Sequence, residues 1–261
     1  MVATVQSMDT QTSALRLAVL IDADNAQAAL IEALLAEVAG IGEASVRRIY
    51  GDFTSSNMSS WKKVLQEHAI RPQQQFAYSK GKNATDSALI IDAMDLLYTG
   101  RFDGFCLVTS DSDFTSLAMR IRESGLQVFG FGEEKTPSAF RNACTRFVST
   151  EVLREPEGPA ESASSSSRGA SKLPALPKKL IREALEGVSN DSGWCHLGTF
   201  GQYLSKRQPD FDTRRYGHRK LSDLVRARTD VFEVDERETP GSAHKVLYVR
   251  AANRSAAGGS S

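Results

Sequence analysis

Four aspartates stand where their carboxylates could act together: Asp22, Asp86, Asp111 and Asp113. Asp22 follows the apolar run LRLAVLI, Asp111 and Asp113 follow a second run, FCLVT, and Asp86 opens a stretch with helical spacing. Both runs are short and strongly apolar, which is typical of strands buried on both faces of a sheet. The carboxyl ends of parallel strands meet at one sheet edge, so we expect these four side chains to gather there.

Clustered carboxylates repel one another in a low-dielectric cleft unless a cation joins them. Oxygen ligands of this kind suit Mg²⁺ or Mn²⁺, and such an ion can activate water and stabilise the leaving oxygen of a phosphodiester. An alternative is that Asp86, Asp111 and Asp113 are only helix N-caps or first-turn acids. The N-cap alternative explains any one of these aspartates taken alone better than it explains why all four are expected at one sheet edge.

Other polar residues lie near the same turns. Asn25 could orient a carboxylate or bind a phosphate oxygen, and Ser110 offers a hydroxyl group. Lys80 and Lys82 precede Asp86 and either hold a phosphate group or belong to a solvated loop. We count these four residues as candidate substrate-binding residues.

The first part of the chain alternates strand patterns with helix patterns, which predicts right-handed βαβ units and a mainly parallel sheet. Asp92 and Asp95 are predicted on a solvated helix face, whereas Trp61 and Phe76 are predicted in the core. We expect strands at about 15–21, 46–53, 70–77, 105–109, 126–131 and 147–149, and helices at about 28–40, 61–69, 87–98, 114–125 and 138–143.

Residues 155–172, EPEGPAESASSSSRGASK, have almost no apolar content and are predicted to be a flexible linker. Beyond them, helical patterns at 176–185, 197–206 and 214–227 precede two alternating strands around a Pro-Gly turn. Three helices and a hairpin predict a small winged helix-turn-helix domain at 173–250. Residues 1–14 and 251–261 are predicted to be disordered.

The two parts differ in charge. Residues 1–154 hold 15 Lys and Arg against 18 Asp and Glu, whereas residues 172–228 hold 12 against 6. The basic segment indicates an anionic partner such as RNA, because cations bind phosphate, although a solvated face with no partner is the alternative. Tyr216 and His218 lie among the cations and could stack on bases. The candidate cations are Lys206, Arg207, Arg214, Arg215, Arg219 and Lys220.

Cys106, Cys144 and Cys195 form no CxxC pair, so neither a disulfide framework nor a zinc cluster is indicated. A reducing, cytoplasmic setting is expected. Residues 1–14 do not have the pattern of a signal peptide, and no apolar run is long enough to span a bilayer. The sequence leaves the oligomeric state open, with a homo-oligomer among the outcomes.

Three blocks, VLIDADN, KNATDSALIIDAMDL and LVTSDSDFTSLAMRIRESGLQVFGFG, resemble in order the signature blocks of the NYN domain, a PIN-like nuclease family that includes LabA-type proteins. The resemblance implies a Rossmann-like α/β three-layer sandwich over 15–154 with a metal-dependent ribonuclease site at the strand ends. Its acidic ligands would be Asp22, Asp86, Asp111 and Asp113, with Asn25 as their polar companion. Many relatives carry Gly where this chain has Ala23-Asp24, which leaves the role of Asp24 open.

Residues 173–250 are similar to the OST-HTH or LOTUS domain, a winged-helix fold linked to RNA binding. The resemblance rests on LPKKLIREALEGVSNDSGWCHLGTFGQYLSKRQPDFDTRRYGHRKLSDLVRA and is looser than that of the first domain. It implies that the basic segment binds RNA. Its pairing with an NYN domain is a recurring architecture.

We therefore expect an endoribonuclease that cleaves RNA by metal-activated water and recruits RNA through its C-terminal domain. One alternative is an RNA-binding regulatory protein with weak or absent nuclease activity. Another, suggested by Asp22-Ala23-Asp24, is a phosphatase of the haloacid-dehalogenase type. Against it, Asn25 follows the DxD directly and no Lys precedes Asp111 on its strand.

Overall fold

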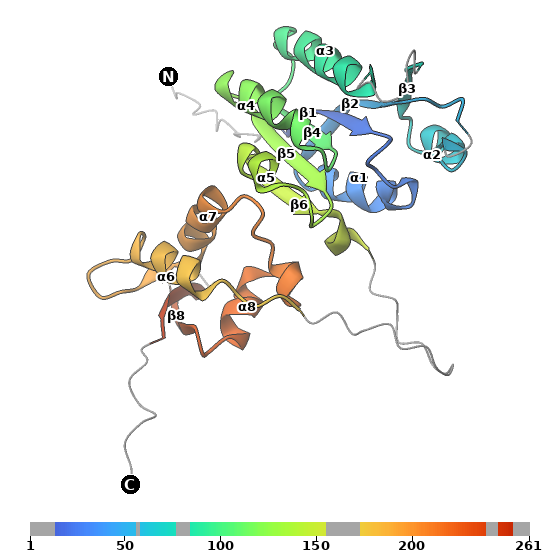
Figure 1. The fold of residues 1–261 in the computed structure, drawn as a ribbon. Helices are drawn as coiled ribbons and strands as arrows, with labels where there is room; N and C mark the ends of the chain where they lie inside the picture. The colour runs from blue at the N-terminus through green and yellow to red at the C-terminus, as the bar shows by residue number, and fades with distance from the viewer. Residues whose placement is uncertain (1–13, 56–57, 77–83, 155–172, 239–244, 253–261) are drawn as a thin grey trace, which may run out of the picture.

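A computed structural model describes residues 14–55, 58–76, 84–154, 173–238 and 245–252 (Figure 1). These ranges form an α/β domain followed by a smaller domain of helices and a short antiparallel sheet. The predicted linker at 155–172 and both predicted disordered ends lie outside the described residues, except for Ala14, Ala251 and Ala252. None of the helices in these ranges combines the length and the apolar character that a bilayer crossing requires.

The first domain is built on a parallel sheet whose strand order, within the described residues, is β3-β2-β1-β4-β5-β6. Helices lie on both faces, as the predicted three-layer α/β fold requires. The strands are β1 (Leu15–Asp22), β2 (Gly42–Gly51), β3 (Arg71–Gln74), β4 (Gly104–Val108), β5 (Gln127–Gly132) and β6 (Arg146–Ser149). The helices are α1 (Ile31–Ala39), α2 (Trp61–Glu67), α3 (Ala84–Tyr98), α4 (Thr115–Glu123) and α5 (Ser138–Ala143).

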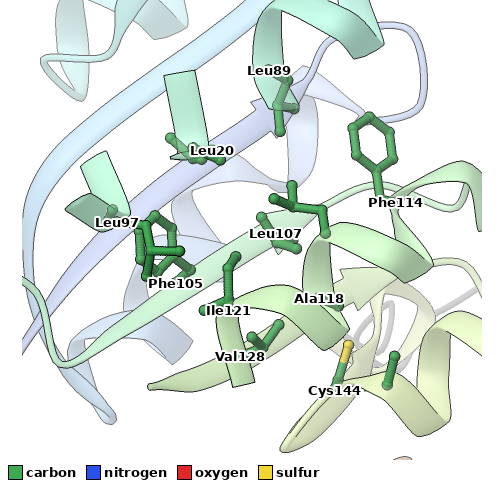
Figure 2. Close-up of a cluster of buried hydrophobic side chains, with 14 of the residues drawn as sticks. Leu20, Leu89, Leu97, Phe105, Leu107, Phe114, Ala118, Ile121, Val128 and Cys144 are labelled. Carbon is green, nitrogen blue, oxygen red and sulfur yellow. The ribbon is translucent and has the colours of Figure 1, made fainter. Parts of the chain in front are cut away.

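The two central strands are buried on both faces because alternate side chains enter different cores. In β1, Ala18 and Leu20 pack with Phe105 and Leu107 of β4 in the core under α3, α4 and α5 (Figure 2). Val19 faces the other way, into the core under α1 and α2. Every position of β4 is buried, which explains why its sequence is continuously apolar.

The strand order reverses at β1: β2 and β3 lie on one side of it, and β4, β5 and β6 lie on the other. β1 pairs with β2 on one side and with β4 on the other, both in parallel. This arrangement is a topological switch point, and its carboxyl edge is where open α/β sheets bind ligands. Asp22 is the last residue of β1, and Asp111 comes three residues after the end of β4, so the predicted acidic turns lie at this crevice.

The second domain consists of α6 (Lys178–Glu186), α7 (Leu197–Arg207) and α8 (Leu221–Ala227) with a sheet of order β7-β9-β8 among the described residues. Its strands are β7 (Cys195–His196), β8 (Phe232–Glu238) and β9 (Lys245–Ala251). The predicted hairpin is present, and the short β7 was not predicted. The predicted helix at 214–227 is wrong in extent, because Gly217 takes a left-handed conformation (φ 81°) that ends a 3-10 turn, Thr213–Tyr216, before α8 begins.

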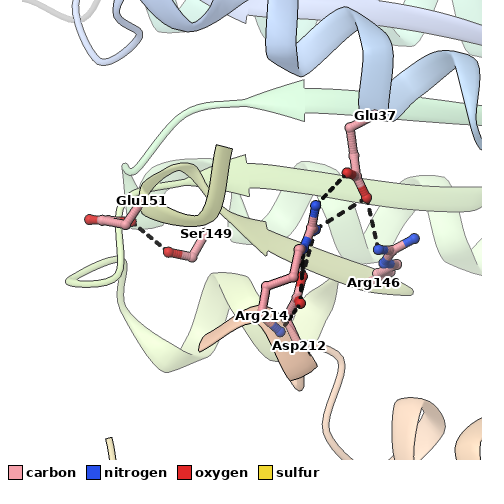
Figure 3. A network of polar contacts seen from close by, with 6 residues as sticks. All are labelled: Glu37, Arg146, Ser149, Glu151, Asp212 and Arg214. Atoms are coloured by element: carbon pink, nitrogen blue, oxygen red, sulfur yellow. Dashed lines mark hydrogen bonds and ion pairs between the residues drawn. The ribbon is translucent and has the colours of Figure 1, made fainter. Parts of the chain in front are cut away.

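The second domain contacts the first through a set of alternating charges, which we call the charge clasp: Glu37, Arg146, Arg214 and Asp212 (Figure 3). The Glu37 carboxylate, on α1, accepts hydrogen bonds from Arg146 Nη2 at 2.9 Å and from Arg214 Nη1 at 2.8 Å. Arg214 also binds Asp212 of its own domain at 2.6 Å. Glu37 and Arg214 are largely shielded from water, so these pairs are screened less than surface ion pairs.

The same interface covers the outer edge of the sheet. On β6, the Phe147 N–H donates to the carbonyl oxygen of Pro209 at 2.8 Å. An edge strand with free N–H groups can pair with another chain, and this contact removes one of those groups. Two more ion pairs cross the interface, Arg141–Asp210 at 2.5 Å and Arg215–Glu134.

We predict that Glu37→Gln loosens the contact between the domains. The change leaves Arg146 and Arg214 without their shared carboxylate, which should cost about 1–3 kcal/mol of docking free energy. Small-angle X-ray scattering should show a larger radius of gyration for this variant at high salt. Glu32→Gln, an exposed position on the same helix, is the matched control, and identical scattering of the two variants would contradict the clasp.

Candidate active site

Three carboxylates meet at the switch point. Within the described residues, oxygens of Asp86, Asp111 and Asp113 lie within 4.8 Å of one another, close enough to share one cation. Asp86 belongs to the first turn of α3, and the other two flank Ser112 after β4. The structure thus brings together three of the four predicted acids from two separate segments of the chain.

Local hydrogen bonds orient the two acids that follow β4. Asp111 is the N-cap of the 3-10 helix Ser112–Phe114, and its Oδ1 accepts from the Asp113 N–H at 2.9 Å. The Asp111 N–H donates to Thr109 Oγ1 at 3.1 Å. The N-cap alternative is therefore correct for Asp111, but it does not exclude a ligand role, because the second carboxylate oxygen is not used by this bond.

Asp22 lies beside these acids in a different environment. It is fully buried, and its carboxylate accepts from Asn25 Nδ2 at 2.6 Å, Thr109 Oγ1 at 3.0 Å and the Asp24 N–H at 3.0 Å. Burial raises the pKa of Asp22, although these hydrogen bonds act in the opposite direction. Asp22 thus connects the end of β1 to the end of β4, and its predicted role as a metal ligand stays a prediction.

The cluster is electrostatically unfavourable without a cation. Burial, followed by the negative charges of Asp22, Asp111, Asp113 and Asp24, raises the pKa of Asp86 to about 6. Like charges at short range disfavour ionisation of each other. A divalent cation would remove this repulsion, and the oxygen-only donor set fits a hard ion such as Mg²⁺ or Mn²⁺.

The structure gives three different outcomes for the predicted substrate-binding residues of the first domain. Asn25 orients Asp22 as predicted for a polar companion, while Ser110 Oγ accepts the Glu133 N–H at 2.8 Å and so holds the turn after β5. Lys80 and Lys82 lie outside the described residues. Sequence reasoning missed Thr109, whose buried hydroxyl bridges Asp22 and Asp111. Thr109 stands between the apolar run FCLV and the acidic turn SDSD, and this position is the sequence signal that could have identified it.

Two expectations about the surface were wrong. Asp92 is not on a solvated face. Its carboxylate forms an ion pair with Arg48 and accepts a hydrogen bond from the hydroxyl group of Tyr50, and both of these residues belong to β2. Phe76, predicted in the core, is 55% exposed, whereas Trp61 is buried as expected. The Asp92 error arose because one helix pattern cannot show which charged positions meet a neighbouring strand.

The candidate RNA-binding residues fall into two groups. Four are exposed: Lys206, Arg207, Arg219 and Lys220. Lys206 and Lys220 line a groove of about 610 Å³ between α7 and the start of α8, with Thr145 of the first domain on its wall. The other candidates face the domain interface: Arg214 and Arg215 form ion pairs there, and the ring of Tyr216 packs against Phe211 at a centroid distance of 5.6 Å.

Among solved structures, the chain is similar to an uncharacterized protein of Nitrosomonas europaea, with 48% identity, covering 39% of this chain and all of that one, at a TM-score of 0.31. A protein of unknown function from Vibrio parahaemolyticus shares 18% identity over 52% of this chain and 93% of that one, at a TM-score of 0.44. A Chromobacterium violaceum protein segment shares 30% identity over 33% and 91% of the two chains, at a TM-score of 0.26. No curated protein matches the chain.

The family comparison covers both domains. Residues 171–243 match the OST-HTH/LOTUS domain, which is an RNA-binding domain. Residues 16–152 match the NYN domain, a nuclease-type domain of the PIN-like class. The two together indicate an RNA-related nuclease or binder. The chain therefore belongs to the NYN domain family and carries a C-terminal OST-HTH/LOTUS domain.

Proposed function

We propose that this protein is a divalent-metal-dependent endoribonuclease whose C-terminal domain recruits the RNA. The observation that carries the proposal is the convergence of Asp86, Asp111 and Asp113 at the switch point of the sheet. Burial, followed by the negative charges of neighbouring aspartates, raises the pKa of Asp86, and this supports a cation at this point. Family membership favours this function over the phosphatase alternative.

The residues of the site have different proposed roles. Asp86, Asp111 and Asp113 would hold Mg²⁺ or Mn²⁺, and the ion, when bound, would lower the pKa of a water molecule and stabilise charge on the phosphodiester. Asp22, fixed by Asn25 and Thr109, would be a fourth ligand, and its negative charge adds to the repulsion on Asp86 that a cation would offset.

The C-terminal domain offers exposed cations for the RNA backbone. Lys206 and Lys220 reach solvent along one groove, where a phosphate backbone could contact both. Arg207 and Arg219 are exposed on the same domain. Binding through such contacts is sensitive to salt, because each neutralised phosphate releases counterions.

The first test is Asp111→Asn. Asn preserves the N-cap but removes a negative ligand, so cleavage of labelled single-stranded RNA with Mn²⁺ or Mg²⁺ should fall by about 100-fold or more. Asp95→Asn on the exposed face of α3 is the matched control and should cleave normally. RNA binding without cleavage by the unmodified protein under any divalent metal would instead favour the regulatory alternative.

The second test uses pH. The pKa of Asp86 rises from 3.8 to about 6 in the folded protein, so ionising it opposes folding; the cost is absent below pH 4 and complete above pH 6. Asp86→Asn should therefore stabilise the metal-free protein at pH 8 by about 1 kcal/mol, after allowance for solvent screening, and should not stabilise it at pH 4. Urea unfolding in a chelator measures the stability of both proteins at both pH values, and an equal effect at the two pH values would contradict the raised pKa of Asp86.

The third test addresses RNA recruitment. Changing Lys206 and Lys220 together to Gln should weaken RNA binding and lower the slope of log K against log salt by about 1.4, since each single-strand phosphate contact contributes about 0.7. Lys178 and Lys179 of α6, changed in the same way, are the control pair. An unchanged slope in the first double variant would place RNA elsewhere.

A further inference from the structure

A hollow of about 740 Å³ lies beside the acidic site, within the volume range of sites for small ligands. It is bounded by the residues after β1, the ends of β2 and β3, and the starts of α2 and α3. Its lining includes the apolar side chains of several alanines, Met58 and Trp61. It also includes the polar residues Asp24, Asp52, Gln75 and Thr85.

The hollow and the acidic site share a rim. Asp24 lines the hollow and is two residues from Asp22, and Thr85 lines it directly before Asp86. Asp24 is also close enough to add to the repulsion on Asp86. A group held in the hollow would therefore lie next to whatever is bound over the three carboxylates.

Asp52, one of the residues that line the hollow, is held in a fixed orientation. Its Oδ1 accepts from the Thr54 N–H at 3.1 Å, from Thr54 Oγ1 at 2.5 Å and from Gln74 Nε2 at 2.7 Å. Gln74 is itself held, because its Oε1 accepts the Phe53 N–H at 3.0 Å. These bonds lower the pKa of Asp52, which favours the charged form of its carboxylate.

All three bonds use the same oxygen of Asp52. Among the described residues, none donates a hydrogen bond to Oδ2. A preorganised, ionised acceptor in a hollow that also has apolar lining residues suits a flat ring that carries an amino group on its edge. Hydrogen bonds to a charged acceptor are stronger than neutral ones, so such a site discriminates between rings with and without a suitable donor.

We infer that the hollow holds the base of the nucleotide next to the cleaved phosphodiester, and that Asp52 accepts a hydrogen bond from an amino group of that base. This inference rests on the proposed RNA-cleaving function, because the shared rim is what places a nucleotide there. Guanine, adenine and cytosine carry an exocyclic amino group, and guanine places a ring N–H next to it. Uracil has no amino group, and its one edge N–H lies between two carbonyl oxygens that would repel the carboxylate, so the site disfavours uracil.

The test uses the full chain without metal, so that binding is measured independently of cleavage. The chain contains two tryptophans, and Trp194→Phe leaves Trp61 of the hollow as the reporter. Titration with GMP and with UMP should give saturable fluorescence changes, with GMP binding about tenfold or more tightly. Asp52→Asn should reduce this preference to about twofold or less.

A second pair of variants guards against local distortion by Asp52→Asn. Ala29→Leu fills the hollow from an exposed position on its wall, whereas Ala39→Leu adds the same side chain to the exposed end of α1. Only the former should weaken GMP binding. Equal affinities for GMP and UMP in the parent protein, or unchanged GMP binding in Ala29→Leu, would overturn the inference.

The outcomes separate the two proposals. Metal-dependent RNA cleavage without base preference at the hollow would reject the base site and retain the nuclease. Base preference with no cleavage under any divalent metal would reject the nuclease and leave a nucleotide-binding hollow. Loss of preference in Asp52→Asn together with normal cleavage by the unmodified protein would support both.

Discussion

Repulsion between carboxylates is the constraint on which the acidic site depends. Separate segments bring Asp22, Asp86, Asp111 and Asp113 to one edge, where burial and then the neighbouring negative charges raise the pKa of Asp86. Such an arrangement opposes folding unless the scaffold compensates for it. The compensation is the doubly buried sheet, whose cores on both faces hold β1 and β4 rigidly in parallel. A cation that offsets the repulsion would then meet ligands already in position.

The contact between the domains determines which arginines remain available to a nucleic acid. Arg214 and Arg215 are engaged with acidic residues of the first domain, so a phosphate would have to displace a charged partner to reach them. Within the part of the chain that the structure describes, Lys206 and Lys220 form no ion pair, so a phosphate in their groove would displace no charged partner there. Thr145 on the groove wall directly precedes β6, whereas the acids lie at the opposite, carboxyl ends of the strands. An RNA that contacts both places would therefore pass along the length of the sheet.

Much of the fold was predictable from the sequence because its strongest signals are local. The apolar runs of β1 and β4, the acids that follow them and the helix starts all follow from short-range patterns. What could not be predicted depends on contacts between distant segments. Asp92 looks like a solvated helix residue until Arg48 and Tyr50 are placed opposite it. Likewise, the basic run around Arg214 cannot reveal that Glu37 binds it from the other domain.

Asp22 differs from the other three acids in what its carboxylate does. Its oxygens accept hydrogen bonds from Asn25 and the Asp24 backbone on one segment and from Thr109 on the other. Thr109 in turn accepts the Asp111 N–H, so one buried carboxylate sets the position of both the acidic turn after β4 and the rim of the neighbouring hollow. Because this carboxylate is shielded from water, replacing it would leave several donors without a partner at once. Its position therefore couples the two sites through geometry, whether or not it touches a cation.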